Sequence, residues 1–576
     1  MASYRTEYDR WLSSGLLDET QMAEMTEIRD KEDILKLRFG MKMDFGTAGL
    51  RSTMNMGPGC MNVFTVAQTT QAIAELIKSE GADARGVAIA YDSRNNSALF
   101  SATAAEVLAG NGIPAYLFDG IRPTPELSFA VRELGCIAGI NITASHNPKE
   151  YNGYKAYWED GAQISPEQAK VVSEAREKID VLTGAKRMPL DAAVAAGIVH
   201  MLGEDFDEKY LAAVLATAID PDGVAAIADT LKIVYTPLHG AGYRLVPEIL
   251  HRLGLKHIYT VPEQMVLDGN FPTVKKPNPE YPDVFALGIA IADRVGSDLV
   301  VATDPDSDRI GVMARTKEGT FRTITGNQMG ALLLDYIIRA RRANGTLTKD
   351  DYAVKSIVST DMAYRIAEVQ GVKLYDVLTG FKFIGEVIKN YERAGKPGRF
   401  LLGFEESYGY LTGSDARDKD AVGAALMICE MTAFYSKQGL TLCDALEELY
   451  KTYGYYREGM TDIYMEGLDG IERRKRVMST LRENPPKTIG GHKVARVGDF
   501  AARTYTDLAT GEKTDSGLPA SDVLVYILDD GDKVIVRPSG TEPKIKIYFL
   551  THAENAAAAE PKLKAYMEDA QHFAEV

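Results

Sequence analysis

Cysteine is scarce in this chain, and that scarcity argues against whole classes of structure. The four cysteines, at positions 60, 136, 429 and 443 of 576 residues, include no Cys-x-x-Cys pair and no spacing typical of a metal site. A disulfide framework, which needs paired cysteines and an oxidising compartment, is therefore not expected. The pattern predicts free thiols in a reducing compartment.

Long apolar runs and a positive charge balance are also missing. Asp293 and Arg294 interrupt one apolar stretch and Glu430 interrupts another, so neither resembles a membrane span. The stretch MASYRTEYDRWLSSG, residues 1–15, carries charges where a signal peptide would have an apolar core. The formal net charge of −16 argues against a nucleic-acid or membrane-surface binder. We expect a cytoplasmic protein in which any anionic ligand meets basic residues gathered locally.

Nucleotide-binding motifs are absent too. No Walker A sequence, G-x-x-x-x-G-K-[ST], occurs. The segment GNGIPA, residues 110–115, superficially matches G-x-G-x-x-A, but it follows a helical pattern and precedes a strand pattern, the reverse of the dinucleotide-binding order. Kinase and dehydrogenase interpretations therefore have little support.

Short apolar strands that alternate with helical patterns fill most of the chain. The strand candidates are residues 86–91, 136–142, 231–236, 298–303, 353–359 and 399–404. This alternation predicts an α/β fold with largely parallel sheets, and at roughly 150 residues a domain the length suggests about four domains. The last hundred or so residues read instead as paired strands followed by a helix. We expect three similar mixed α/β domains, at residues 1–205, 206–318 and 319–455, and a smaller C-terminal α+β domain at 456–576.

Three carboxylates follow the apolar run at 298–303. The loop TDPDSDRIG, residues 303–311, carries Asp304, Asp306 and Asp308 at alternate positions, and alternate side chains of an extended chain point the same way. Converging carboxylates repel one another, and Mg²⁺, which prefers oxygen ligands, is the natural counter-charge. A calcium loop would need Gly and Glu where this chain has Arg309 and Arg315. The plainer alternative is a solvated acidic turn.

A second loop, NITASHNPKEYNGYK at residues 141–155, contains a candidate reactive serine. Ser145 does not fit the hydrolase elbow G-x-S-x-G, because Thr143 occupies the first glycine position. A phosphate on Ser145 beside a metal is the better interpretation, since phosphoryl transfer mainly needs charge neutralisation and alignment. His146 and Lys155 would neutralise that phosphate or move the proton of the attacking hydroxyl. Taken alone, Ser145 reads as an ordinary loop serine.

Two further loops have the composition of ligand-binding sites. In GFEESYGY, residues 403–410, Glu405 and Ser407 are two positions apart and suit the reading of sugar hydroxyls. In RPSGTEPK, residues 537–544, an arginine and a Ser-Gly-Thr turn suit a phosphate. A polar turn and a hairpin turn, respectively, are the plainer alternatives.

Together these motifs and FGTAGLR, residues 45–51, resemble the α-D-phosphohexomutase superfamily over roughly residues 40–550. The length and the GFEES form are most similar to the phosphoglucomutase and phosphopentomutase branch. Tyr408 stands where mannose- and glucosamine-type relatives usually have glycine. The resemblance implies four domains around a central cleft, each giving one loop.

The resemblance also implies roles for individual residues. Ser145 holds the transferable phosphate and joins Asp304, Asp306 and Asp308 as a Mg²⁺ ligand. The basic residues around the transferred group are Arg51, Lys155 and Arg309, with Lys155 a candidate general acid/base and His146 beside the serine. The substrate contacts are Glu405, Ser407, Lys382, Arg537, Ser539, Gly540 and Thr541.

The implied activity is a reversible mutase acting on small sugar phosphates, with Mg²⁺ as cofactor. Phospho-Ser145 gives its phosphoryl group to O6 of α-D-glucose 1-phosphate. The glucose 1,6-bisphosphate so formed, which also serves as activator, returns its other phosphate to the serine. A phosphopentomutase and a phosphomannomutase are alternatives within the family. Outside it stand a phosphatase with Asp304 as nucleophile and a non-catalytic sugar-phosphate-binding regulator.

Overall fold

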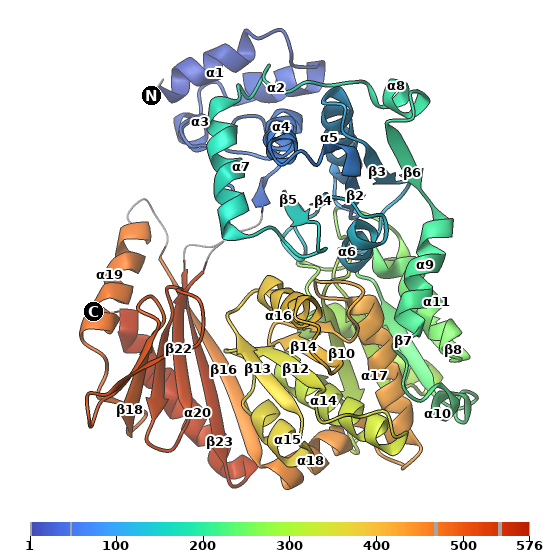
Figure 1. Cartoon of the computed structure of the whole chain (residues 1–576), viewed down its shortest axis with the longest axis vertical. Coiled ribbons are helices and arrows are strands. Elements are labelled where there is room, and N and C mark those ends of the chain that lie inside the picture. Colours follow the sequence, from blue (N-terminus) through green and yellow to red (C-terminus); the bar gives the residue numbers. More distant parts are fainter. Residues whose placement is uncertain (1–2, 47–48, 466–469, 540–543, 575–576) are drawn as a thin grey trace. The chain divides into compact units, whose positions relative to one another are not determined.

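The computed structural model describes residues 3–46, 49–465, 470–539 and 544–574. The chain divides into two compact units that interleave in sequence (Figure 1). The first contains Met1–Arg315, Gly319–Thr323 and Gly409–Lys437, and the second contains Thr316–Glu318, Ile324–Tyr408 and Gln438–Val576.

Three short helices open the first unit: α1 (Tyr4–Leu12), α2 (Glu19–Glu27) and α3 (Glu32–Phe39). A side-chain cap from Ser3 begins α1, and a capping box at Asp18 begins α2. The helices enclose a small apolar core that includes Trp11, at 0% exposure, and Phe39.

The first sheet has the order β1-β5-β4-β2-β3-β6. The strands are β1 (Gly49–Thr53), β5 (Tyr151–Trp158), β4 (Ala138–Ile142), β2 (Val87–Tyr91), β3 (Ala115–Phe118) and β6 (Val199–Leu202). Strands β4, β2, β3 and β6 run parallel, whereas β5 and β1 are antiparallel to their neighbours. The apolar runs form the centre because both faces of β2 and β4 are covered.

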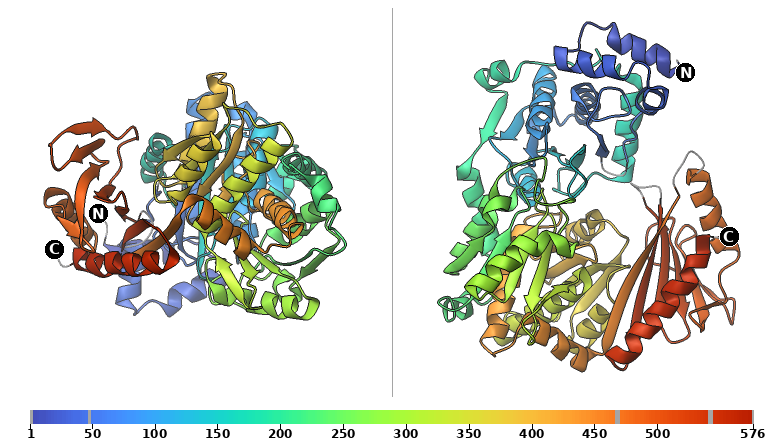
Figure 2. Two further views of the ribbon diagram at one scale, coloured as in Figure 1. Left: turned by 90° about the horizontal axis from the view of Figure 1, so that it is seen from below. Right: turned by 180° about the vertical axis from the view of Figure 1, so that it is seen from behind.

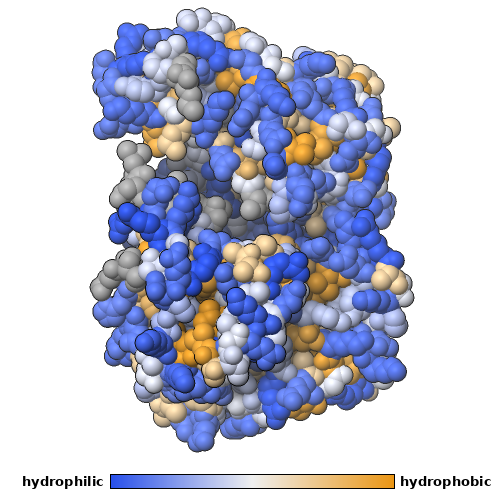
Figure 3. All heavy atoms as spheres, turned by 60° about the vertical axis from the view of Figure 1, so that its left-hand side comes forward, coloured by the Kyte–Doolittle hydropathy of each residue, from blue (hydrophilic) through white to orange (hydrophobic). Residues whose placement is uncertain are grey.

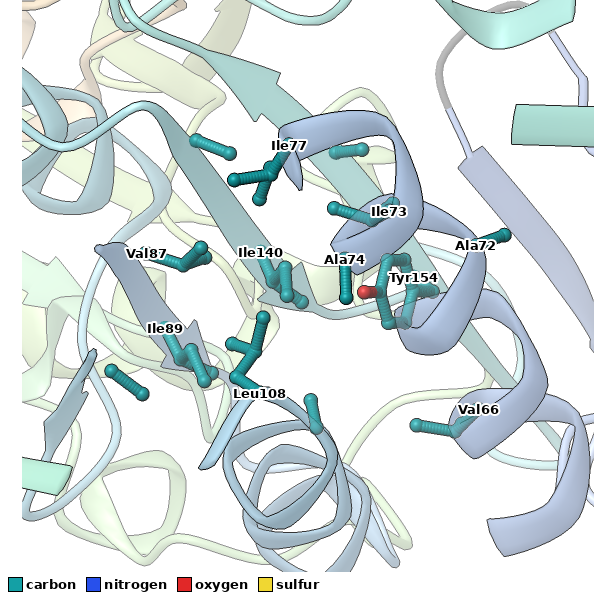
Figure 4. Close-up of a cluster of buried hydrophobic side chains, with 14 of the residues drawn as sticks. Val66, Ala72, Ile73, Ala74, Ile77, Val87, Ile89, Leu108, Ile140 and Tyr154 are labelled. Atoms are coloured by element: carbon teal, nitrogen blue, oxygen red, sulfur yellow. The ribbon is translucent and has the colours of Figure 1, made fainter. Parts of the chain in front are cut away.

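Helices α4 (Val63–Ser79) and α5 (Ser97–Gly110) cover one face of this sheet, and α6 (Thr124–Glu133) packs on the other (Figure 1). In Figure 4, Ile73 and Ile77 of α4 point toward the strand residues Val87, Ile89 and Ile140. Helices α7 (Pro166–Lys178) and α8 (Leu190–Ala195) complete this part of the unit.

The second sheet has the order β11-β10-β9-β7-β8. Its strands are β11 (Phe321–Ile324), β10 (Ile310–Arg315), β9 (Leu299–Thr303), β7 (Lys232–Thr236) and β8 (His257–Thr260), with β9, β7 and β8 parallel and β10 antiparallel to β9. The accompanying helices are α9 (Glu204–Leu215), α10 (Pro221–Ala225), α11 (Gly242–Arg252), α12 (Pro262–Met265) and α13 (Ala286–Val295). Strand β15 (Gly409–Leu411) and helix α17 (Ala421–Ser436) also belong to this unit, and α17 packs against α9, α10 and α11.

The second unit begins with a parallel arrangement of β13 (Lys373–Val377), β12 (Tyr352–Ser356) and β14 (Phe400–Glu405), in that order. Its helices are α14 (Gly326–Ala343), α15 (Met362–Gln370), α16 (Phe381–Arg393) and α18 (Leu442–Tyr453). Gly330 lets α14 lie close to β14, since a Cβ there would meet the Phe404 ring at 2.3 Å.

The C-terminal part of this unit is an antiparallel sheet with the order β16-β23-β22-β21-β18-β19-β20, and β17 pairs with β18. The strands are β16 (Tyr455–Tyr464), β17 (Thr488–Ile489), β18 (His492–Asp499), β19 (Thr504–Asp507), β20 (Lys513–Asp515), β21 (Leu524–Leu528), β22 (Lys533–Pro538) and β23 (Lys544–Ala553). Helix α20 (Ala556–Ala570) lies along β16 and β23 (Figure 2), and α19 (Gly470–Glu483) contacts β22.

The α/β class, with three mixed sheets and a separate C-terminal antiparallel sheet, is confirmed. The six apolar runs are β2, β4, β7, β9, β12 and β14. None of the four cysteines forms a disulfide in the described structure, as expected, and all four are buried. Among the residues described above, no helix combines the length and apolar character needed to cross a membrane. The face drawn in Figure 3 is mostly hydrophilic, with scattered apolar patches.

Candidate active site

The serine loop joins β4 to its antiparallel neighbour β5 in the first unit. Ser145 is 3% exposed and has a left-handed backbone, with φ of +51°. Its Oγ donates to Oδ2 of Asp304 at 2.6 Å and lies 3.2 Å from Nδ1 of His146. Two loops that are 159 residues apart in sequence therefore meet at the hydroxyl that was predicted to react.

The acidic loop likewise joins a buried strand, β9, to its antiparallel neighbour β10. Oxygens of Asp304, Asp306 and Asp308 lie within 4.8 Å of one another, and all three residues are buried. The loop is a tight turn, not the extended chain we expected: the N–H of Ser307 donates to the carbonyl of Asp304 at 2.9 Å, and Ser307 has φ of +53°. The three carboxylates do converge, but a tight turn brings them together and not the alternation of an extended chain.

Three helix N-termini hold this turn. The carbonyls of residues 305–307 accept hydrogen bonds of 2.7, 2.8 and 3.2 Å from the N–H groups of Ala241, Thr124 and Ala421, respectively. These donors stand at the starts of α11, α6 and α17. Helix N-termini carry a partial positive charge, so three of them stabilise a turn that bears three carboxylates. Gly240 permits this approach, since a Cβ there would meet Cα of Pro305 at 2.4 Å.

Two lysines face the carboxylates directly. Nζ of Lys155, on β5, lies 2.7 Å from Asp306 and 3.1 Å from Asp308, and Nζ of Lys419 lies 3.1 Å from Asp308. Burial alone would raise the pKa of Asp308, but Lys155, Lys419 and Arg309 outweigh it and hold that pKa well below its usual value. Burial would lower the pKa of Lys155, but the two aspartates raise it. The predicted local cluster of positive charge is present.

Two other groups have shifted pKa values. Burial, reinforced by Asp306 and Asp308, raises the pKa of Asp304 well above its usual value. His146 keeps some exposed surface, yet burial and the nearby Arg309 and Arg51 lower its pKa well below the ordinary value. The shift favours the neutral imidazole and makes it a weaker base than an ordinary histidine.

The acidic turn fits a hard divalent cation. Oδ1 of Asp306 and Oδ1 of Asp308 are buried, and neither has a hydrogen-bond partner within the described ranges. A buried carboxylate oxygen left without a partner is costly. Oxygen ligands without nitrogen or sulfur suit Mg²⁺ in preference to zinc.

The two predicted arginines of this site flank the loops. Arg51 lies on β1, opposite Gly153 of β5, and donates to Oδ1 of Asn147 at 3.1 Å. Arg309 directly follows the acidic turn and forms an ion pair with Glu280 at 2.7 Å. Both arginines thus belong to the same cluster as Ser145.

The second unit contains the predicted sugar-reading residues. Glu405 ends β14, is 6% exposed, and accepts a hydrogen bond of 2.7 Å from the N–H of Gly380. Lys382 lies two residues after Gly380, in the first turn of α16. Ser407 follows β14 and is partly exposed. The neighbouring Glu406 has its pKa raised by burial and by Glu405, against the opposing effect of Arg537.

The predicted phosphate loop follows β22 in the same unit. Arg537 lies on β22 opposite Lys546 of β23. Nε of Arg537 is buried and has no hydrogen-bond partner in the described parts of the chain. The carbonyl of Ser539 accepts from Arg474 at 3.0 Å. Lys544 pairs with Asp462 at 2.8 Å. The other two predicted residues, Gly540 and Thr541, lie outside the described residues.

Sequence reasoning missed three residues of the first unit. Thr124 donates its hydroxyl to Asp306 at 2.8 Å, Lys419 contacts Asp308, and Arg94 donates to the carbonyl of Ser145. A signal existed for Lys419, because it lies two residues before the apolar run that forms α17. Arg94 follows strand β2 in the same way that the serine loop follows β4.

Family models match the chain in four consecutive segments. They are the phosphoglucomutase/phosphomannomutase alpha/beta/alpha domains I (residues 42–182), II (208–319) and III (325–453) and the C-terminal domain (491–568). Together the matched segments cover well over half of the chain.

Curated relatives and solved structures agree with these matches. A phosphoglucomutase from Staphylococcus saprophyticus is 36% identical over 547 residues, which cover 95% of this chain and 96% of the relative. One from Staphylococcus aureus is 34% identical over 92% of this chain and 93% of its own length. Among solved structures, the Paramecium phosphoglucomutase parafusin has a TM-score of 0.66 at 17% identity, covering 93% of this chain and 96% of its own. A phosphoglucomutase/phosphomannomutase family protein from Burkholderia thailandensis has a TM-score of 0.65 at 18% identity, covering 92% and 97%. These two show the fold.

Proposed function

We propose that this chain, which belongs to the α-D-phosphohexomutase superfamily, interconverts α-D-glucose 1-phosphate and glucose 6-phosphate. The observation that carries the proposal is the contact of 2.6 Å between Oγ of Ser145 and Asp304 of the acidic turn. A serine hydroxyl among three carboxylates and two lysines suits phosphoryl transfer, which depends mainly on charge neutralisation and alignment. The names of the 34–36% identical relatives support the choice of glucose.

In the proposed first half-reaction, the bond between phosphorus and Oγ of phospho-Ser145 breaks as a new bond forms to O6 of the sugar. The proton of the O6 hydroxyl passes to a basic side chain. In the second half, the phosphorus–O1 bond of glucose 1,6-bisphosphate breaks, the phosphoryl group returns to Oγ, and the proton goes to O1. Lys155 and His146 are the residues proposed to take part in this proton exchange, supported by their positions beside the turn and the serine. Arg51 and Arg309 are proposed to neutralise the transferring group.

Asp304, Asp306 and Asp308, with Ser145, are the residues proposed to hold Mg²⁺. A bound Mg²⁺ would supply positive charge that stabilises the transferring phosphoryl group. Oδ1 of Asp306 and Oδ1 of Asp308, which have no hydrogen-bond partner among the described residues, support this assignment. Thr124 and the three helix N-termini orient the ligands.

The second unit is proposed to bind the rest of the substrate. Glu405 and Ser407 would read sugar hydroxyls, with Lys382 as a basic contact nearby. Arg537 and Ser539, with Gly540 and Thr541, would hold the phosphate that is not being transferred. We also propose domain boundaries near residues 205, 318 and 455, which the four matched segments support.

A phosphorus NMR time course with Mg²⁺ and a trace of glucose 1,6-bisphosphate tests the proposal. We expect fast conversion of glucose 1-phosphate, and slower or no conversion of mannose 1-phosphate and ribose 1-phosphate in parallel samples. Preference for ribose 1-phosphate would indicate a phosphopentomutase. Release of inorganic phosphate would support the phosphatase, and an unchanged spectrum in every sample would contradict a mutase altogether.

Arg537→Ala should weaken substrate binding. A charge-assisted bond to phosphate is worth about 1.5–3 kcal/mol, which corresponds to roughly a 10- to 150-fold rise in KM for glucose 1-phosphate. Steady-state kinetics measure it. Arg496→Ala is the matched control, because Arg496 lies in the same sheet and packs on the Tyr505 ring. If both variants kept the wild-type KM, RPSGTEPK would not be the phosphate loop.

A further inference from the structure

One buried arginine donates hydrogen bonds to backbone carbonyls along the serine loop. Arg94 follows β2, is 3% exposed, and directs its guanidinium at carbonyl oxygens of that loop. Its NH1 and NH2 groups donate to the carbonyls of Ser145, Asn147, Pro148 and Tyr151. Such a planar fork of donors can bind several acceptors at once, which a lysine ammonium does less well.

Asp92 connects this arginine to the serine from a second side. Oδ2 of Asp92 lies 3.4 Å from Nε of Arg94 and accepts from the hydroxyl of Thr143 at 2.6 Å. The same hydroxyl accepts from the N–H of Ser145 at 2.8 Å. The N–H and the carbonyl of Ser145 are therefore both tied to the Asp92–Arg94 pair.

This arrangement explains how Ser145 keeps an uncommon backbone. Its φ of +51° lies in the left-handed region, which non-glycine residues occupy only when their surroundings fix them. Arg94 is in turn packed against an aromatic ring: its guanidinium carbon lies 5.0 Å from the centroid of the Phe271 ring. Phe271 is itself buried with φ of +49°.

We propose that the Asp92–Arg94 pair is the positioning element of the reactive serine, which sets the direction of Oγ toward the acidic turn. The pair touches backbone and Thr143, so it acts through the loop and not on the substrate. Misplacing a reacting group by about 1 Å can cost roughly 100-fold in rate. This proposal rests on the proposed role of Ser145 as phosphoryl carrier.

Arg94→Lys tests it, because the substitution keeps the buried charge but cannot reach all four carbonyls. We expect kcat to fall by roughly 100-fold while KM for glucose 1-phosphate stays within about threefold. The matched control is Arg85→Lys, since Arg85 also binds backbone carbonyls, those of Gly135 and Cys136 just before β4. The control should keep the wild-type kcat. A folded Arg94→Lys enzyme as fast as the control would overturn the proposal.

Thr143→Val decides the matter if Arg94→Lys does not fold. Valine has the shape of threonine but lacks the hydroxyl that joins Ser145 to Asp92, so we expect a roughly tenfold loss of kcat at unchanged KM. A wild-type kcat in this variant would also overturn the proposal. Uptake of phosphate from glucose 1,6-bisphosphate, followed by intact mass, separates the two hypotheses. If wild-type protein took up none on Ser145, the proposed function would fail; if wild type and Arg94→Lys took it up equally fast, only the positioning role would fail.

Discussion

Ser145→Ala should lose essentially all mutase activity, by about 10⁴-fold or more, while the protein stays folded. The variant lacks the atom that would carry the phosphoryl group between the two half-reactions, and the proposed mechanism depends on that covalent carrier. The stability cost should be small, because one hydrogen bond to Asp304 is lost and such bonds contribute about 0.5–1.5 kcal/mol net. Coupled assays of glucose 6-phosphate formation and a thermal melt measure the two effects.

Ser128→Ala is the matched control for this experiment. Ser128 is also buried. Its Oγ donates to the carbonyl of Gly161 at 2.6 Å and accepts from the N–H of Arg417 at 2.8 Å, so the substitution removes the hydrogen bonds of a buried serine away from the loop. We expect it to keep near-normal turnover. Normal turnover in Ser145→Ala would refute the phosphoserine mechanism, and covalent phosphate on Asp304 of that variant would identify a phosphatase.

Local sequence patterns predicted the centre of each sheet and the loops that follow. Strands β4 and β9 are apolar runs because both of their faces are buried, and the polar residues after them can only lie at a strand end. That reasoning placed Ser145 and the three aspartates correctly in loops. It did not predict that Lys155 lies on a strand, because β5 forms by antiparallel pairing with β4 and that pairing has no local sequence signal.

The rest of the first unit's site depends on contacts between segments that are far apart in sequence, and no local sequence pattern predicts these contacts. Lys419 reaches Asp308 because residues 409–437 pack in the first unit, although the segments before and after them belong to the second. Arg94 binds carbonyl oxygens, which every residue carries, so its partners have no signature in sequence. Helix α6 could be predicted as a helix, but not that Thr124 at its start would meet Asp306.

Removing Mg²⁺ should cost the enzyme at least about 100-fold in kcat. The metal is expected to supply several kcal/mol of charge stabilisation to the transferring phosphoryl group, and each 1.4 kcal/mol is about tenfold in rate. A readout independent of activity is thermal stability: at a Mg²⁺ concentration of about 100 Kd, binding to the folded state alone adds about 2.7 kcal/mol. We therefore expect the melting temperature to rise with added Mg²⁺ and to fall back with a chelator.

Asp306→Asn should abolish the Mg²⁺-dependent rise, because it removes the charge from a buried carboxylate whose Oδ1 has no hydrogen-bond partner in the described structure. Asp529→Asn is the control, since Asp529 belongs to the partly exposed group formed with His492 and Asp530. If the rise came from weak binding to surface carboxylates, the control would lose it and Asp306→Asn would keep it. A chelator-treated enzyme with full activity and an unchanged melting temperature would show that the acidic turn works without a divalent cation, with Lys155, Lys419 and Arg309 supplying the positive charge.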